Sequence, residues 1–221
     1  MTVVPRQRAP QSTTRPKSVV VAMSFSGDDT ALVAALRENH PGAKAAFFDR
    51  YARQVERIIT HVIGFDRELV DVVQEVFANA LGSIHTLEDA AALKRWLSRV
   101  ATLTARKVLR TRSRRAWLRL FADSEDEERL EPPAVGLEQE VLSALRAVYE
   151  VLDGLPADER IAFALRFVEG MELTEVAAAT NVSLSTAKRR LKRAEAHFLA
   201  GARRRPELSE WLRGGSRWEG P

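Results

Sequence analysis

The sequence contains no cysteine and no apolar run long enough to cross a bilayer. The lack of thiols excludes disulfides and thiolate metal sites, and it is compatible with a reducing cytoplasm. No glycine-rich loop of the phosphate-cradling kind occurs. The four histidines are scattered, without the spacing of a metal site or a catalytic triad: His40, His61, His85 and His197. We therefore expect a protein that is not an enzyme and that needs no metal, no cofactor and no small-molecule substrate.

Strand-like alternation and fixed-period repeats are also missing. In 221 residues, 45% are hydrophobic and 29% are charged, which is typical of a globular chain of one or two domains. Apolar residues instead recur at helical spacing over most of the length. The sequence thus predicts an all-α fold.

The net charge is only +4, but the charges are segregated along the chain. A basic block at 106–119 contains no acid, an acidic run at 123–131 follows it, and a second basic block lies at 188–205. Basic faces attract a polyanion, whereas an acidic connector avoids or imitates one.

Periodicity and breaks predict two helical domains. The first, 27–116, has helices at 30–39 (capped by Asp28 or Asp29), 43–64, 66–81 and about 90–115, with a loop at 82–89. The second, 137–205, has a middle helix opened by Pro156. The remaining segments are predicted as a disordered tail at 1–26, an acidic linker at 117–136, and a C-terminal tail from Pro206 to 221.

Residues 170–194 have the pattern of a helix-turn-helix. Val176 and Ala177 continue one apolar face, and small Ala177 allows two helices to approach closely. Asn181 accepts the left-handed conformation that a tight turn needs, and Ser183 is a suitable cap for the next helix.

The second helix of this motif divides its faces. Apolar residues share one side: Ala187, Leu191, Ala194 and Phe198. Cationic residues crowd the other sides: Lys188, Arg189, Arg190, Lys192 and Arg193. A recognition helix needs this division, with one side held by its own domain and one for phosphates and base edges. An ordinary helical hairpin with a solvated basic face is the alternative.

Several segments together resemble the extracytoplasmic-function (ECF) group of bacterial sigma factors. These are FFDRYARQVERI, DVVQEVFANAL and RWLSRVA in the first half, and LPADERIAFALRFVEGM followed by LTEVAAATNVSLSTAKRRLKRA in the second. The resemblance implies a sigma region 2-like bundle and a region 4-like helix-turn-helix domain joined by a flexible acidic linker. It also implies that the chain binds core RNA polymerase, recognises the −35 duplex and melts the −10 element.

Site residues follow from the same resemblance. Core-polymerase contacts are expected at Asp71, Gln74, Glu75 and Asn79. Contacts to the −10 single strand are expected at Arg99, Arg106, Lys107 and Arg110, with the loop at 82–89 as a wall for an extruded base. Contacts to the −35 element are expected at Ser185, Thr186, Lys188, Arg189, Arg190 and Arg193.

Three positions depart from the family pattern. Leu103 stands in place of an asparagine and Lys107 in place of an acid, which puts the −10 sequence in question. Glu172 replaces a serine or threonine cap and should weaken the first helix of the motif slightly.

The implied partners are core RNA polymerase (through its clamp coiled coil and flap), promoter DNA and an anti-sigma factor. The protein itself is expected in the cytoplasm. One rival is a helix-turn-helix activator of response-regulator type that is not a polymerase subunit, but it would need an αβ receiver domain. Another is an adaptor that inhibits a sigma factor, which would have little use for two arginine-rich blocks.

Overall fold

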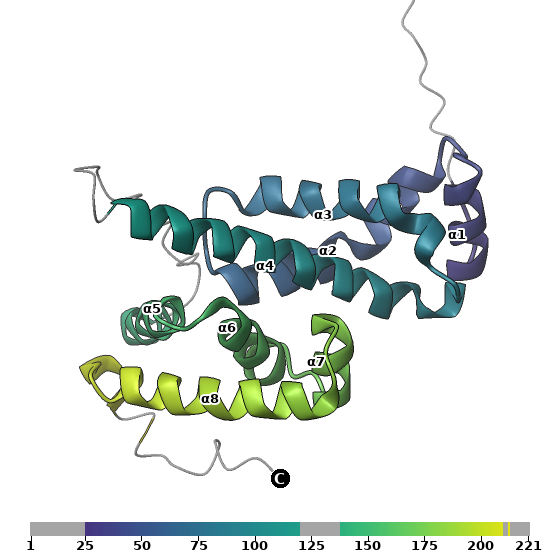
Figure 1. Ribbon diagram of the computed structural model, residues 1–221. Helices are drawn as coiled ribbons and strands as arrows, with labels where there is room; N and C mark the ends of the chain where they lie inside the picture. Colours follow the sequence, from purple (N-terminus) through teal and green to yellow (C-terminus); the bar gives the residue numbers. More distant parts are fainter. Residues whose placement is uncertain (1–24, 120–137, 210–211, 213–221) are drawn as a thin grey trace, which may run out of the picture.

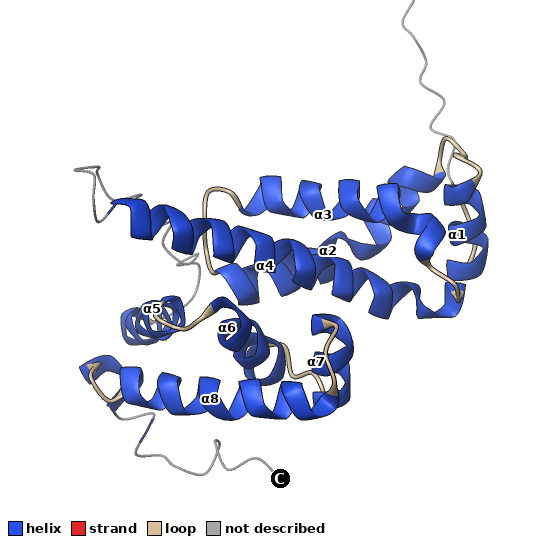
Figure 2. Ribbon diagram, in the orientation of Figure 1, coloured by secondary structure: helices blue, strands red, loops and turns tan. Residues whose placement is uncertain are grey.

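The computed structural model describes residues 25–119, 138–209 and 212 (Figure 1). These residues form helices and turns and no strand, which confirms the all-α prediction (Figure 2). The α-helices are α1 (Asp29–Arg37), α2 (Ala43–Ile63), α3 (Leu69–Ser83), α4 (Leu93–Arg119), α5 (Gln139–Asp153), α6 (Ala157–Phe163), α7 (Leu173–Thr180) and α8 (Leu184–Ala202). The short helical turns are η1 (Ile84–Thr86), η2 (Ala90–Ala92), η3 (Ala164–Val168) and η4 (Pro206–Leu208).

Helices α1 to α4 form the N-terminal unit. α2 packs against both α3 and α4, and α1 closes one end of the bundle (Figure 1). The apolar faces meet as the periodicity predicts, with Phe47, Val55 and Ile58 of α2 fully buried. The rings of Phe47 and Phe77 meet edge to face, with centroids 5.3 Å apart, and so tie α2 to α3.

Helices α5 to α8 and η4 form the C-terminal unit, which contains the predicted helix-turn-helix in α7 and α8. Asn181 occupies the left-handed region, with φ 57° and ψ 49°. The Ser183 side chain accepts a hydrogen bond from the Thr186 N–H at 3.3 Å and caps α8. All four apolar residues expected on the inner face of α8 are buried. The local prediction is confirmed.

The start of α7 has a complete cap. The Glu172 side chain accepts a hydrogen bond from the backbone of Glu175, and the Glu175 carboxylate accepts one from the Glu172 N–H at 2.8 Å. This reciprocal pair is a capping box built from two glutamates. Glu172 therefore takes part in capping this helix, and the slight weakening expected from the missing serine or threonine stays a prediction.

Several predicted boundaries differ from those of the structure. α3 runs to Ser83 and η1 follows at once, so the expected loop at 82–89 is mostly helical, with Ile84 and Leu87 buried. α4 continues to Arg119, past the boundary placed at 116. Pro206 does not end the ordered part, because it begins η4, whose Leu208 is buried against the C-terminal unit. Periodicity did not reveal η1 and η4, since short 3₁₀ turns carry almost no pattern of their own.

The middle helix of the C-terminal unit changes its geometry at Ala164. α6 passes directly into η3, a π-helical turn. Beyond it, the Glu169 N–H donates to the Ala164 carbonyl and the Met171 N–H donates to the Leu165 carbonyl, each at 2.9 Å. A π turn widens the helix locally, so it redirects the residues that follow it.

The two units pack on each other, and one of the two buried clusters of the described residues includes side chains from both. Ile161, Leu165 and Val176 of the C-terminal unit belong to the same buried cluster as α2 and α4. α7 and α6 lie against α4 (Figure 1). The sequence predicted two helical domains, and the structure adds that one buried cluster crosses the contact between them, while a second lies within the C-terminal unit around Val151, Phe163 and Phe198. Periodicity could not show the shared cluster, because it marks an apolar face but not the surface that covers it. The predicted N-terminal tail (apart from residues 25 and 26), the linker from residue 120 onward and most of the C-terminal tail lie outside the described residues.

Candidate nucleic-acid and protein interfaces

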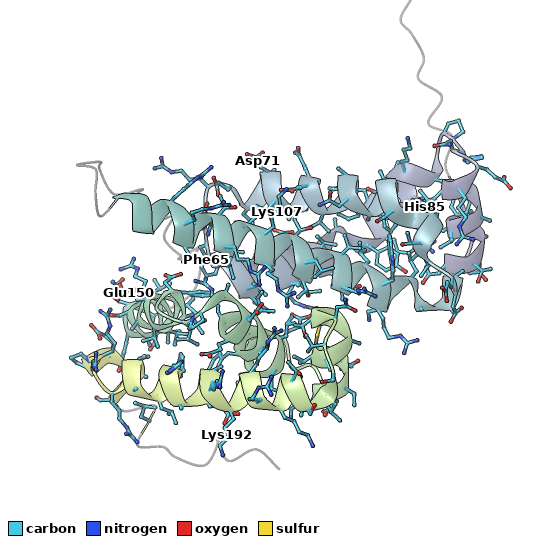
Figure 3. The ribbon with its side chains drawn as sticks, in the orientation of Figure 1. Phe65, Asp71, His85, Lys107, Glu150 and Lys192 are labelled. Carbon is cyan, nitrogen blue, oxygen red and sulfur yellow. The ribbon has the colours of Figure 1, made fainter. Side chains whose placement is uncertain are left out.

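The residues expected to contact polymerase lie together on the outer side of α3. Asp71, Gln74 and Asn79 are exposed and Glu75 is half-buried. Asp71 lies on the edge of the molecule opposite Lys192 of α8 (Figure 3). Two of the four have partners on α4: Glu75 Oε1 lies 2.8 Å from Lys107 Nζ, and Asn79 Nδ2 donates to Thr104 Oγ1 at 3.2 Å. Within the described part of the chain, Asp71 and Gln74 are therefore the residues of this row whose exposed polar groups have no partner.

Sequence reasoning missed the apolar part of this face. Val70, next to Asp71, is 64% exposed, and Phe48 of α2 is 44% exposed while its ring packs on Phe77 at 4.8 Å. Exposed apolar side chains rimmed by polar ones are typical of protein-binding surfaces. Val70 could have been found, because it is the one exposed large apolar residue of α3 and lies outside the helical spacing of the buried residues.

The basic residues expected on α4 separate into different environments. Arg99 is exposed, whereas Lys107 pairs with Glu75. Arg106 and Arg110 both reach Asp158 of α6, with contacts of 2.9 Å and 3.7 Å. The expected track of four cations is thus not continuous in this conformation.

The recognition helix presents a cationic outer face. Lys188, Arg189 and Arg193 are exposed, and so is Lys192, which the choice of −35 residues omitted. Ser185 and Thr186 stand in the first turn, where each side chain hydrogen-bonds the Ser183 hydroxyl at 3.0 Å.

Arg190 is the exception on this helix. Its Nη2 donates to Asp158 Oδ2 at 2.9 Å, so it points toward α6 and not outward. The sequence could not show this, because Arg190 and Asp158 are 32 residues apart.

Arg106 has the most perturbed charge of the predicted DNA-binding residues. Burial lowers the pKa of its guanidinium, the nearby Arg190 and Arg110 lower it further, and Asp158 opposes them. Its Nη2 also donates to the carbonyl of Thr180, at the end of α7, at 3.2 Å. This arginine is therefore built into the contact between the two units.

Neither metal-binding clusters nor membrane spans occur in the described parts of the chain. Over residues 25–119 and 138–209, no three or more histidine and acidic side chains gather as a metal site. None of the helices in the same ranges is long and apolar enough to span a bilayer.

Comparison with known proteins assigns the two units. The family model for Sigma-70 region 2 matches residues 47–115, and that for Sigma-70, region 4 matches residues 145–198. The ECF RNA polymerase sigma-E factor of Haemophilus influenzae is 30% identical over 178 residues, which cover 75% of this chain and 90% of that relative. The ECF RNA polymerase sigma factor SigX of Bacillus subtilis is 28% identical over 146 residues, 64% of this chain and 74% of the relative.

Two solved structures share the fold. CnrH in complex with the cytosolic domain of CnrY has a TM-score of 0.53 at 20% identity and covers 85% of this chain and 99% of its own. The sigma factor RpoE in complex with the anti-sigma factor NepR from Bartonella quintana has a TM-score of 0.54 at 19% identity, with coverages of 72% and 96%.

The fold and the two matched regions define a protein of the sigma-70 class. Within that class, the chain belongs to the ECF RNA polymerase sigma factors. It is a promoter-recognising sigma factor that directs transcription initiation. The region 2 match of the first unit removes the alternative of a response-regulator-type activator, which needs a receiver domain there.

Proposed function

We propose that the outer face of α3 docks on the clamp coiled coil of core polymerase, with Asp71 and Gln74 as polar contacts beside Val70. Their joint exposure supports this assignment. Polar side chains around an apolar contact fix the orientation of a docked helix and add specificity. Glu75 and Asn79 stabilise the position of α3 through their bonds to α4.

The outer face of α8 is assigned to the −35 duplex. The observation that carries this assignment is the division of the helix, with Leu191 and Phe198 buried and Lys188, Arg189 and Arg193 exposed. Ser185 and Thr186 in the first turn are assigned to base edges, and the later cations to phosphates.

The basic residues of α4 are assigned to the strand that is held open at the −10 element. A cationic groove that follows the backbone is what a single strand requires. Arg99 and Lys107 are accessible for this task, whereas Arg106 and Arg110 reach DNA only when they leave Asp158.

The remaining assignments concern context. The protein acts as a specificity subunit without catalytic chemistry of its own, in the cytoplasm where polymerase and promoter DNA are found. Because two proteins of the same fold were solved with the cytosolic domain of CnrY and with the anti-sigma factor NepR, an anti-sigma factor is proposed as a regulator.

In vitro transcription with purified core polymerase on a fragmented genomic library tests the whole proposal. The transcripts are sequenced to locate their 5′ ends on the DNA. The DNA upstream of these 5′ ends should share −35 and −10 motifs, and such transcripts should be absent when the protein is left out. Random 5′ ends, or no gain over core polymerase alone, would refute the assignment.

A further inference from the structure

One carboxylate on α6 gathers three arginines from the DNA-contacting helices. Asp158 contacts Arg106 of α4 at 2.9 Å, Arg190 of α8 at 2.9 Å and Arg110 of α4 at 3.7 Å. α6 lies between α4 and α8, so Asp158 stands where the two units meet (Figure 1).

The charges of this cluster are not balanced. Three guanidinium groups share a single carboxylate, and water reaches the central ones poorly, since the side chains of Arg106, Arg190 and Asp158 are 16%, 24% and 26% exposed. Like charges held close in such surroundings repel one another more strongly than in bulk water. Without the carboxylate, the three guanidinium groups would repel one another with no opposing charge from Asp158.

The 2.9 Å contact between Arg106 Nε and Asp158 Oδ1 is an ion pair whose geometry makes no hydrogen bond. Arg190 Nη1 is likewise buried without a hydrogen-bond partner among the described residues. Both guanidinium groups thus retain donors that a phosphate, with its larger number of acceptor oxygens, can satisfy better.

Arg106 and Arg190 cannot bind Asp158 and a DNA phosphate with the same donors. We propose that Asp158 occupies, within the chain, the place of a DNA phosphate, and so latches the −10 and −35 surfaces together in a closed conformation. DNA phosphates compete for the same arginines and favour its opening. This inference depends on the proposed roles of α4 and α8 in DNA binding.

Two further contacts between the units stabilise the closed conformation together with Asp158: an ion-pair contact and buried apolar packing. Glu169 binds Arg57 and His61 of α2, and Ile161, Leu165 and Val176 are buried between the units. Opening exposes these apolar side chains to water, which favours the closed state. Asp158 therefore shifts the ratio of closed to open molecules and does not set it alone.

The full-length chain and its Asp158→Asn variant provide the test. Because the sequence has no cysteine, two cysteines introduced at exposed positions, Lys44→Cys and Ala200→Cys, can be labelled for single-molecule energy transfer. The variant should show a larger open fraction at low salt. The parent protein should open as salt or a non-specific DNA duplex is added, whereas the variant should respond less.

DNA affinity gives an independent readout. The Asp158→Asn variant should bind a non-specific duplex about three- to tenfold more tightly in fluorescence anisotropy, because its binding-competent fraction rises. Glu150→Gln is the matched control, since it removes the same charge from a pair with Arg205 inside the C-terminal unit. Asp158→Glu, which keeps the charge, should restore the behaviour of the parent protein.

Equal tightening by Glu150→Gln, or an unchanged open fraction in Asp158→Asn, would overturn the latch. Circular dichroism checks that both variants remain folded. A protein without the latch should still direct transcription. If the Asp158→Asn variant transcribes normally and its open fraction is unchanged, the latch proposal is refuted but the proposed function stands. Loss of promoter-specific initiation by the parent protein would remove the proposed function itself.

Discussion

Arg57 of α2 holds Glu169 with two nitrogens, although the two residues are 112 positions apart. Arg57 Nε and Nη2 lie 2.9 Å and 2.6 Å from Glu169 Oε1, and His61 Nδ1 lies 2.9 Å from Oε2. The Glu169 side chain is only 4% exposed, whereas that of Arg57 is 56% exposed. A buried carboxylate of this kind is tolerated because it is paired.

Removal of Arg57 should therefore destabilise the protein. Arg57→Ala leaves the carboxylate of Glu169 with fewer donors, at an expected cost of about 1–3 kcal/mol in the free energy of unfolding. Urea denaturation followed by circular dichroism measures it. Arg53→Ala, at an exposed arginine of the same helix, is the control and should change stability little. Equal losses in both variants would mean that the bond to Glu169 adds nothing.

The contact between α5 and α8 depends on a glycine. A Cβ added at Gly201 would lie 2.8 Å from Cγ1 of the buried, branched Val151. Gly201→Ala should therefore lower stability by roughly 1–3 kcal/mol through overpacking. Gly82, near the end of α3, has nothing within 4 Å of its added Cβ, and Gly82→Ala should stabilise by about 0.5–1 kcal/mol. Thermal unfolding of the two variants should shift in opposite directions.

Asn181 carries the turn of the helix-turn-helix with a positive φ of 57°. Asn181→Ala should cost about 1–2 kcal/mol, because alanine lacks the side chain that makes this region accessible to asparagine. Asn181→Gly should lie close to the parent protein, since glycine adopts the conformation freely but gains entropy when unfolded. Chemical denaturation ranks the three proteins, and an alanine variant as stable as the glycine variant would contradict the argument.

Salt dependence should report the phosphate contacts of α8. Arg189 and Arg193 are exposed and Arg190 is held by Asp158, so the first two are the clean positions to test. The double change Arg189→Ala, Arg193→Ala should reduce the slope of log affinity against log salt for promoter DNA by about two. The matched double change Arg203→Ala, Arg205→Ala, at exposed positions just after the C-terminal end of α8, should leave this slope nearly unchanged.

Reversal of charge on α3 should separate the protein from polymerase. Asp71→Lys places a cation in an exposed polar row and should reduce co-purification with core polymerase at least about tenfold, since like-charge contacts across an interface cost several kcal/mol. Glu75 is less suitable, because its change would also release Lys107. Glu207→Lys, on η4, makes the same charge change at an exposed site away from this face. If both variants co-purify normally, Asp71 lies outside the interface.

Local features could be predicted from the sequence, whereas long-range pairings could not. Asn181, Ser183 and the inner face of α8 follow from rules that act within a few residues. The Asp158 cluster joins residues from three helices. No local sequence pattern around these residues indicates that they meet. The core was predicted element by element, but its continuity across Ile161, Leu165 and Val176 depends on how the units dock.

The π-helical turn at Ala164–Val168 sets an angular register for everything after it. One residue corresponds to about 100° of rotation around a helix axis. A chain shortened by one residue there would swing Glu169 away from Arg57 and turn Val176 out of its buried site. The widened turn therefore sets the orientation of α7 relative to α2. Because α8 follows α7, it sets the orientation of the recognition helix as well.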